Sequence, residues 1–202
     1  MLDSSIWRAT TLKGRRALKK LLILAMLLIG ATGAWAGELA GVTMPDTVQV
    51  GDDSLSLNGM GLRKKSIIKV YVGGLYLSEP SSEAGNILAA DSPRVTRMSF
   101  LRGVKAGQLC GGWTEGLENN TPGASAEVAQ QFETLCSYME DMGKGDAMVY
   151  AYQPGKGTTV EVNGAVKGTL GGKPFADALF ACWIGDEPPS AEFRDGLLGR
   201  SH

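Results

Sequence analysis

The chain has 202 residues, with 20 Lys and Arg residues against 21 Asp and Glu residues, and 44 % of its residues are hydrophobic. This is the composition of a globular protein of one domain, and it excludes a disordered or fibrous chain. The absence of a basic excess argues against nucleic-acid binding, and His202 as the only histidine excludes a histidine-based metal site and a Ser-His-Asp triad.

The first 36 residues have the pattern of a signal peptide. Six basic residues and one acidic residue precede or flank an apolar run over residues 21–36, which ends in Ala34-Trp35-Ala36. A basic start, an apolar run and a small-x-small end predict a cleaved signal peptide over residues 1–36, and therefore export to the periplasm. An N-terminal membrane anchor is the alternative, although it needs roughly 20 apolar residues. Residues 37–202 then form one exported domain with 14 basic and 20 acidic residues, a net charge of −6.

The first half of this domain is dominated by strand patterns. Residues around 51–53 are typical of a turn, and the segment from Ile67 onward is β-branched and aromatic without a helical stripe, which predicts a long, largely buried strand. The predicted strands are Val42 to Val50, Ser54 to Leu57, Ile67 to Leu77 and Arg94 to Leu101.

The second half alternates helices and strands. Ser125 is predicted as an N-cap, Gly143 as a helix stop, and Asn163-Gly164 as a hairpin turn. The predicted helices are Lys105 to Glu118, Ser125 to Met142, Phe175 to Ile184 and Ala191 to Leu198, and the strands are Ala147 to Gln153, Thr158 to Val162 and Ala165 to Leu170. This order predicts an α+β fold with helices on one face of a large antiparallel sheet.

The three cysteines, Cys110, Cys136 and Cys182, are an odd number, so at most one internal disulfide can form. Each lies on the apolar stripe of a predicted helix. We therefore interpret them first as small buried hydrophobic residues, and we expect at least one inaccessible thiol. Their wide spacing and the lack of a CxxC motif argue against redox or zinc chemistry.

Four segments carry a family resemblance: GMGLRKKSIIKVYVGGLYL (59–77), RMSFLRGVKAGQLCGGWTEGL (97–117), GDAMVYAYQPGKGTTVEVNGAVKGTLGG (145–172) and FADALFACWIGDEPP (175–189). Together they resemble the bacterial exported branch of the chalcone isomerase-like family. The resemblance implies an open-faced β-sandwich, with helices layered on a large antiparallel sheet and a ligand cleft between the two layers.

The resemblance also distinguishes two kinds of family member. The plant enzymes cyclise a chalcone without a cofactor, and related non-catalytic members bind a fatty-acid carboxylate with an arginine and a tyrosine. Here Tyr71 occupies the strand position of the enzymes' threonine, and Arg63 matches the arginine of the binders. Leu109 and Gly116 fall where the enzymes carry a tyrosine and an asparagine on the first helix, so most of the catalytic hydrogen-bond network is missing.

The chemistry of Arg63 and Tyr71 agrees with carboxylate binding. A guanidinium offers a planar fork of donors that suits a carboxylate, and a phenol adds a neutral donor. The structural alternatives are that Arg63 pairs with a surface Asp or Glu and that Tyr71 is a half-buried strand aromatic. Tyr76 replaces Tyr71 if the strand register slips by one residue, since that turns the other face inward.

The sequence thus predicts an exported chalcone isomerase-like protein that binds a small amphipathic carboxylate such as a fatty acid, with Arg63, Tyr71 and Tyr76 as candidate ligand-binding residues. No cofactor, metal or nucleic acid is expected. One alternative is a cofactor-independent isomerase or lyase acting on an unsaturated carbonyl compound, with Arg63 stabilising developing negative charge. The other alternative is an interaction module that binds an envelope partner.

Overall fold

A computed structural model describes residues 37–200, so the predicted signal peptide lies outside the described residues. The described residues form one compact unit, which contains two clusters of buried hydrophobic residues. No helix among the described residues is both long enough and apolar enough to cross a membrane.

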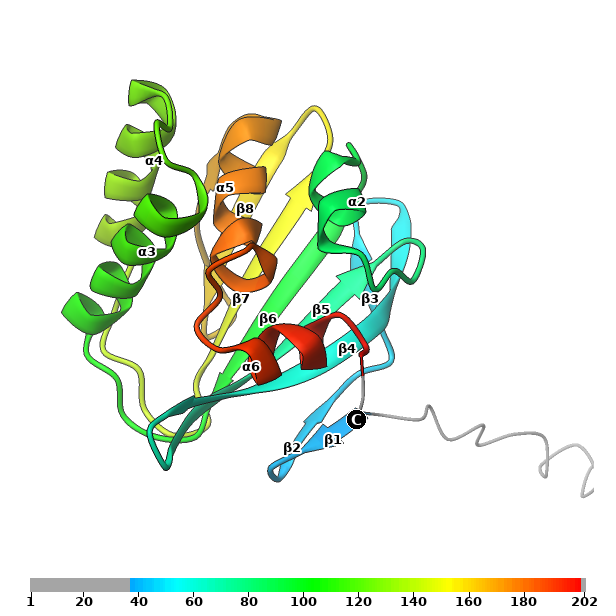
Figure 1. Cartoon of the computed structure of the whole chain (residues 1–202), viewed down its shortest axis with the longest axis vertical. Coiled ribbons are helices and arrows are strands. Elements are labelled where there is room, and N and C mark those ends of the chain that lie inside the picture. Colours follow the sequence, from blue (N-terminus) through cyan, green and yellow to red (C-terminus); the bar gives the residue numbers. More distant parts are fainter. Residues whose placement is uncertain (1–36, 201–202) are drawn as a thin grey trace, which may run out of the picture. The chain divides into compact units, whose positions relative to one another are not determined.

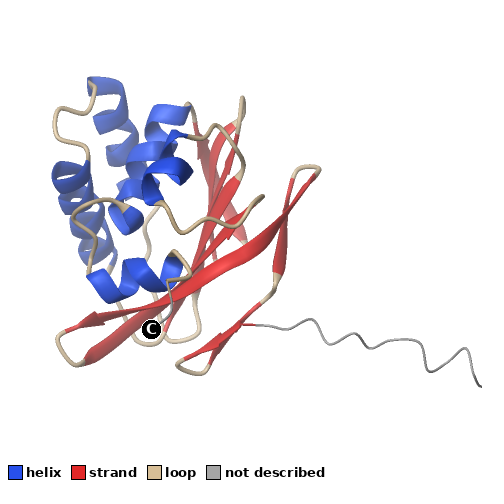
Figure 2. Ribbon diagram, turned by 45° about the vertical axis from the view of Figure 1, so that its right-hand side comes forward, coloured by secondary structure: helices blue, strands red, loops and turns tan. Residues whose placement is uncertain are grey.

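The architecture is a seven-stranded antiparallel sheet in the order β3-β4-β5-β6-β7-β8-β9, with a separate β1-β2 hairpin. The strands are β1 (Gly37–Leu39), β2 (Val42–Met44), β3 (Thr47–Val50), β4 (Asp53–Lys65), β5 (Ile68–Leu77), β6 (Arg94–Phe100), β7 (Ala147–Gln153), β8 (Gly157–Val162) and β9 (Ala165–Leu170). The helices are α2 (Ala84–Ala89), α3 (Ala106–Asn120), α4 (Ala126–Ser137), α5 (Lys173–Ile184) and α6 (Ala191–Leu197), and they gather on one face of the sheet (Figures 1 and 2). This confirms the predicted α+β open-faced arrangement.

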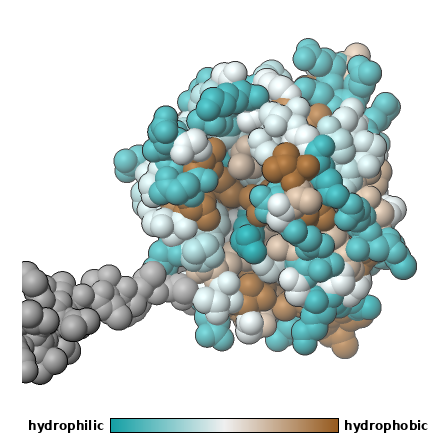
Figure 3. Space-filling view, turned by 180° about the vertical axis from the view of Figure 1, so that it is seen from behind, coloured by the Kyte–Doolittle hydropathy of each residue, from teal (hydrophilic) through white to brown (hydrophobic). Residues whose placement is uncertain are grey.

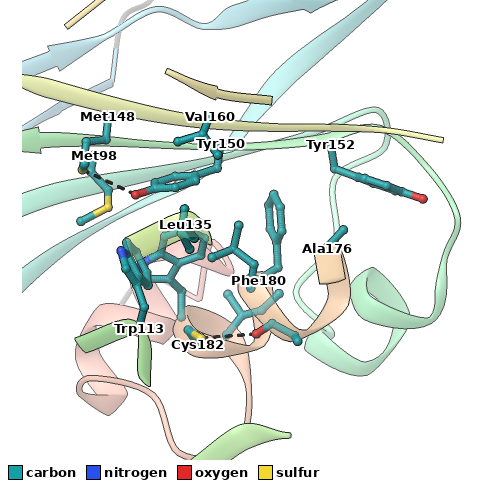
Figure 4. Packing of buried hydrophobic residues seen from close by; sticks show 14 of the residues in the cluster. Met98, Trp113, Leu135, Met148, Tyr150, Tyr152, Val160, Ala176, Phe180 and Cys182 are labelled. Atoms are coloured by element: carbon teal, nitrogen blue, oxygen red, sulfur yellow. Dashed lines mark hydrogen bonds between the residues drawn. The ribbon is translucent and has the colours of Figure 1, made fainter. Parts of the chain in front are cut away.

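The main core lies between the sheet and α5, which buries nine of its residues. Aromatic rings dominate its centre: Trp113 stacks edge-on against Tyr150 and Trp183, with ring centroids 5.4 and 5.2 Å apart. Figure 4 shows Trp113 of α3 reaching toward Tyr150 of β7, with Cys182 of α5 beside them. Large aromatic side chains contribute strongly to core energetics, so these contacts fix where α3 and α5 lie.

A charged group at the other end of α5 is fully buried. The Arg94 side chain at the start of β6 is 0 % exposed and pairs with Asp177 of α5, which also pairs with Lys173 at 2.5 Å. Arg94 donates to the Ile87 carbonyl of α2 at 2.7 Å and lies over the ring of Phe180 at 4.9 Å. Because a buried charge needs a partner, this network ties α2 and β6 to α5.

Two glycines of β4 bring α6 directly onto the strand. A Cβ at Gly59 or Gly61 would overlap carbonyl oxygens of α6, including those of Gly196 and Phe193. The strand predicted over Ser54 to Leu57 stops before these glycines. The structure instead continues β4 through them to Lys65, with a bulge near Asn58, because helix packing selects glycine here despite its weak strand propensity.

Other differences from the predicted elements have local causes. Pro45 interrupts the predicted strand over residues 42–50, which becomes β2 and β3. The helix begun by Ser125, whose hydroxyl accepts from the Val128 N–H at 3.3 Å, ends at Ser137 rather than Met142. Met142 instead forms a bridge with Val104, so the chain there is drawn toward the loop before α3.

The short helix α2 was not predicted, whereas the Asn163-Gly164 turn is confirmed, with both residues at positive φ.

Candidate functional site

A cleft with a volume of about 630 Å³ opens between α3 and the paired ends of β4, β5 and β6. Its walls combine aliphatic and aromatic side chains with three basic and two acidic side chains. The apolar side chains are those of Ile68, Val70, Tyr71, Met98, Phe100, Val104, Leu109, Trp113, Trp183, Pro188 and Pro189, and the charged ones are those of Arg63, Lys65, Arg102, Glu115 and Glu187. A volume of this size falls within the roughly 300–1,000 Å³ of small-molecule sites.

Arg63 and Tyr71 are direct partners across the β4–β5 ladder, and both line the cleft. Residues directly opposite in an antiparallel pair project from the same face, so the two predicted residues come together. A register shift follows immediately between Arg63 and Lys64. Such a bulge bends the strand, here just before the hairpin tip at Ser66 and Ile67.

Arg63 is half-buried as a residue, and one nitrogen of its guanidinium donates to the Lys64 carbonyl. Among the described residues no carboxylate lies within 4.0 Å of it, so the predicted alternative of a surface ion pair is not what the structure has. A guanidinium carries five N–H donors, and most of those on Arg63 are therefore free at the cleft.

Tyr71 is 9 % exposed and packs between the rings of Phe100 of β6 and Phe193 of α6, with centroids 5.7 and 5.5 Å away. Burial raises the pKa of the Tyr71 phenol well above its ordinary value, opposed in part by the Arg63 charge and the Trp183 side chain. The hydroxyl therefore keeps its proton at neutral pH. It can serve as a neutral hydrogen-bond donor beside a cation.

Tyr76 lies elsewhere. It belongs to a second cluster, with Val50, Leu55 and Val95, on the sheet face opposite to the cleft, and its buried hydroxyl has no hydrogen-bond partner within residues 37–200. Burial raises the pKa of Tyr76 to about 12. Because side chains alternate along a strand and Tyr71 faces the helices, Tyr76 five positions later faces away, and it does not line the cleft.

The resemblance implied a cleft between sheet and helices, but no residue of α3 was predicted to bind the ligand. Leu109 and Gly116, the two positions of α3 named from the resemblance, both line the cleft. A Cβ at Gly116 would lie 2.7 Å from Cys182 Sγ, so this glycine lets α3 approach α5. A Cβ at Gly111 or Gly112 would meet no atom within 4 Å. Glycines inside a helix are unfavourable by about 1 kcal/mol each, so their repetition along α3 is the sequence signal that could have identified this wall.

The cysteines divide into a pair and a single thiol. Cys110 of α3 and Cys136 of α4 form a disulfide, which corrects the interpretation of these two as buried hydrophobic residues. Cys182 of α5 is a free, buried cysteine, as expected for at least one of the three, and burial raises its pKa to about 12. The thiol is therefore protonated and shielded, which does not suit a nucleophile.

No group of three or more His, Cys, Asp or Glu side chains in residues 37–200 is arranged to hold a metal ion. The cleft instead offers apolar surface, the guanidiniums of Arg63 and Arg102, and the Tyr71 phenol, together with the charges of Lys65, Glu115 and Glu187. This combination can bind an anionic head group and an apolar tail at once.

The model of a family described as chalcone isomerase-like matches residues 36–199. The chain belongs to the chalcone isomerase-like family. Among solved structures, a fatty-acid binding protein from Arabidopsis thaliana matches this chalcone isomerase-like domain with a TM-score of 0.65 and 18 % identity, over 82 % of this chain and 95 % of that chain. This likeness shows the shared fold, and no curated protein matches the sequence.

Proposed function

We propose that this protein binds a small amphipathic carboxylate, such as a fatty acid, in the cleft, with Arg63 and Tyr71 holding the carboxylate. The proposal rests chiefly on Arg63, a half-buried residue at the cleft whose guanidinium has no carboxylate within 4.0 Å among the described residues. A guanidinium removed from water is stabilised by an anionic partner, and a carboxylate matches its fork of donors. The Arabidopsis protein of the same fold is named a fatty-acid binding protein, which agrees with this assignment.

Tyr71 supplies the second donor. Its raised pKa keeps the phenol neutral, so it donates a hydrogen bond without adding charge. A charge-assisted hydrogen bond contributes about 1.5–3 kcal/mol and a neutral one about 0.5–1.5 kcal/mol. Arg63 is therefore the main anchor, and Tyr71 orients the head group.

The remaining walls suit an apolar tail. Met98, Phe100, Leu109 and Trp113 line the cleft beyond the two donors. Burial of apolar ligand surface stabilises a complex by roughly 25 cal/mol per Å². The tail thus contributes affinity, while the head group fixes orientation.

The residues at two positions of the cleft favour binding without turnover over isomerase chemistry. Leu109 and Gly116 line the cleft where the resemblance places the enzymes' tyrosine and asparagine, and neither carries a group that donates or accepts a proton. Turnover of a chalcone by the purified protein, lost in Arg63→Ala, would instead establish the isomerase alternative.

Export is part of the proposal. The basic and apolar pattern of residues 1–36 supports it, and so does the Cys110–Cys136 disulfide, since disulfides persist mainly in oxidising compartments. We expect processed protein recovered from the periplasm to begin at Gly37. N-terminal sequencing that reads from Met1 would contradict cleavage.

Binding is tested by titrating residues 37–202 with a fatty acid and with the alcohol of the same chain length. The two probes share a tail and differ in charge, so we expect the acid to bind about tenfold or more tightly, the lower end of a charge-assisted hydrogen bond. Equal affinity for both would show that no cation anchors the head group. Mass spectrometry of small molecules that co-purify with the protein identifies the natural ligand.

A further inference from the structure

The tip of the β4–β5 hairpin exposes apolar side chains beside the cleft. Ile67 is 92 % exposed and Ile68 is 45 % exposed, and they are two of the three large hydrophobic side chains exposed in the described part of the chain, the third being Val166. Ser66 adopts a left-handed conformation, with φ of 57°, at this turn. Positive φ is uncommon for a non-glycine residue, and here it belongs to the tight turn that carries the exposed Ile67.

The same tip carries a concentrated positive charge. Arg63, Lys64, Lys65 and Lys69 lie within seven residues that contain no Asp or Glu, whereas the rest of residues 37–200 has 10 basic and 20 acidic residues. None of these four cations has a carboxylate within 4.0 Å among the described side chains. The hairpin is thus a basic tip on an acidic domain.

The arrangement of two of these lysines is unfavourable for the hairpin itself. Lys64 and Lys69 are directly opposite each other across the ladder. Like charges in this position destabilise a strand pair. An anionic surface outside the protein would relieve that repulsion.

Neighbouring loops extend the basic surface. The Leu101 N–H bonds to the Val70 carbonyl at 2.9 Å, which brings the exposed Arg102 beside the base of the hairpin. The nearby Asp141 is already engaged, because it pairs with Lys105 at 2.6 Å. Seen from behind, apolar atoms also reach the surface at the lower right edge, the end of the sheet where this hairpin lies (Figure 3).

We propose that the β4–β5 hairpin docks the protein onto an anionic lipid surface, with Ile67 inserted among the acyl chains and the lysines on the head groups. Exposed apolar residues flanked by lysines bind lipid interfaces by apolar burial together with electrostatic attraction. A soluble polyanion would use the lysines but would leave Ile67 in water. The isoleucines therefore favour a lipid surface.

Docking at this tip would also position the cleft. Lys65 and Ile68 belong both to the hairpin and to the cleft lining, so the mouth of the cleft would face the lipid. A fatty acid then passes between membrane and cleft with little exposure to water. This transfer role rests on the proposed function, whereas docking itself does not.

The test measures co-sedimentation of residues 37–202 with vesicles of phosphatidylcholine alone and with about one third phosphatidylglycerol. We expect binding to the anionic vesicles that weakens as salt rises from about 0.1 M to about 1 M. Ile67→Ser should weaken binding about tenfold, and Lys64→Gln combined with Lys69→Gln about 25-fold, at roughly fivefold per charge near the surface. None of these three side chains lines the cleft.

Two matched controls separate the tip from general surface properties. Val166→Ser removes an exposed apolar side chain from β9 at the opposite edge of the sheet, and Lys156→Gln removes an exposed lysine from the β7–β8 turn at the opposite end. Both should bind vesicles as wild type does. Equal loss in the controls, or binding that does not depend on anionic lipid, would overturn the proposal.

The remaining outcomes are equally decisive. If the lysine variant loses binding while Ile67→Ser does not, the tip recognises a polyanion by charge alone and lipid insertion is wrong. Fatty-acid affinity in solution is measured on the same variants and should be unchanged. Vesicle binding that fails while the fatty acid still binds refutes docking alone, and the reverse result refutes the proposed ligand alone.

Discussion

Replacing Arg63 with alanine tests the carboxylate anchor from the protein side. Arg63 lies opposite Tyr71 across the β4–β5 ladder, and the substitution removes a cleft-lining guanidinium that has no ion-pair partner among the described residues. The lost charge-assisted hydrogen bond is worth about 1.5–3 kcal/mol, so the dissociation constant of a fatty acid should rise by about ten- to a hundredfold. Because Arg63 is half-buried and partly screened by water, the lower end of this range is expected.

The size of the effect is interpreted through three companion variants. Tyr71→Phe removes a neutral donor and should weaken binding by about 0.5–1.5 kcal/mol, less than Arg63→Ala. Arg63→Lys keeps the charge but loses the planar fork, so its affinity should fall between those of wild type and Arg63→Ala. Arg97→Ala removes a half-buried guanidinium that does not line the cleft, and it should leave the affinity unchanged.

Isothermal titration of each variant, with circular dichroism to confirm the fold, measures these differences. Equal affinity of wild type and Arg63→Ala would refute the anchor, as would an equal loss in Arg97→Ala. A larger loss in Tyr71→Phe than in Arg63→Ala would reverse the assigned roles. The order of the two effects therefore decides the assignment as much as their size.

Three further predictions concern stability. Gly111→Ala fills open space and should raise the free energy of unfolding by about 0.5–1 kcal/mol. Gly116→Ala brings a Cβ to 2.7 Å from Cys182 Sγ, so its free energy of unfolding should be lower than that of Gly111→Ala by about 1–3 kcal/mol. Equal free energies of urea unfolding for the two variants would contradict the close approach of α3 to α5. Asp177→Ala leaves the fully buried Arg94 without its carboxylate and should lower the free energy of unfolding by about 3–5 kcal/mol in the same assay. A loss under 1 kcal/mol would show that the carbonyl partners of Arg94 stabilise its charge without Asp177. Burial raises the Cys182 pKa from 9.0 to about 12, so the native state retains this proton longer than the unfolded state; this contribution to stability is fully present below pH 9 and is lost as pH rises toward 12. Cys182→Ala should make the decline above pH 9 less steep in thermal unfolding, and an unchanged slope would count against burial of the thiol.

Local signals predicted most of the elements correctly. Ser125 as an N-cap and Asn163-Gly164 as a turn act through their own backbone, so the sequence is sufficient there. The glycines of β4 could not be assigned in this way. Their place in a strand depends on α6, which lies more than 130 residues further along the chain and packs against them.

The candidate site likewise combines features that local sequence predicts with features that depend on tertiary contacts. The alternation of side chains along β5 separates Tyr71 from Tyr76, but which of them faces the helices depends on the register of the sheet. The turn at Ser66 that sets this register has no glycine or asparagine at its positive-φ position, so the sequence did not reveal it. The Cys110–Cys136 pairing likewise required the spatial proximity of two helices.

The contact of α6 with the β4 glycines has a consequence for how binding specificity can change. Main-chain atoms of β4 and α6 are in contact at Gly59, Gly61 and Gly196, so a larger side chain at these positions does not fit. This contact holds in place the strand that carries Arg63. The facing wall has Gly111 and Gly112, where added side chains would meet empty space. Substitution on α3 would therefore reshape the tail pocket while the anchoring arginine stays where it is. For protein engineering, the β4 wall is therefore kept unchanged and the α3 wall is the one to vary.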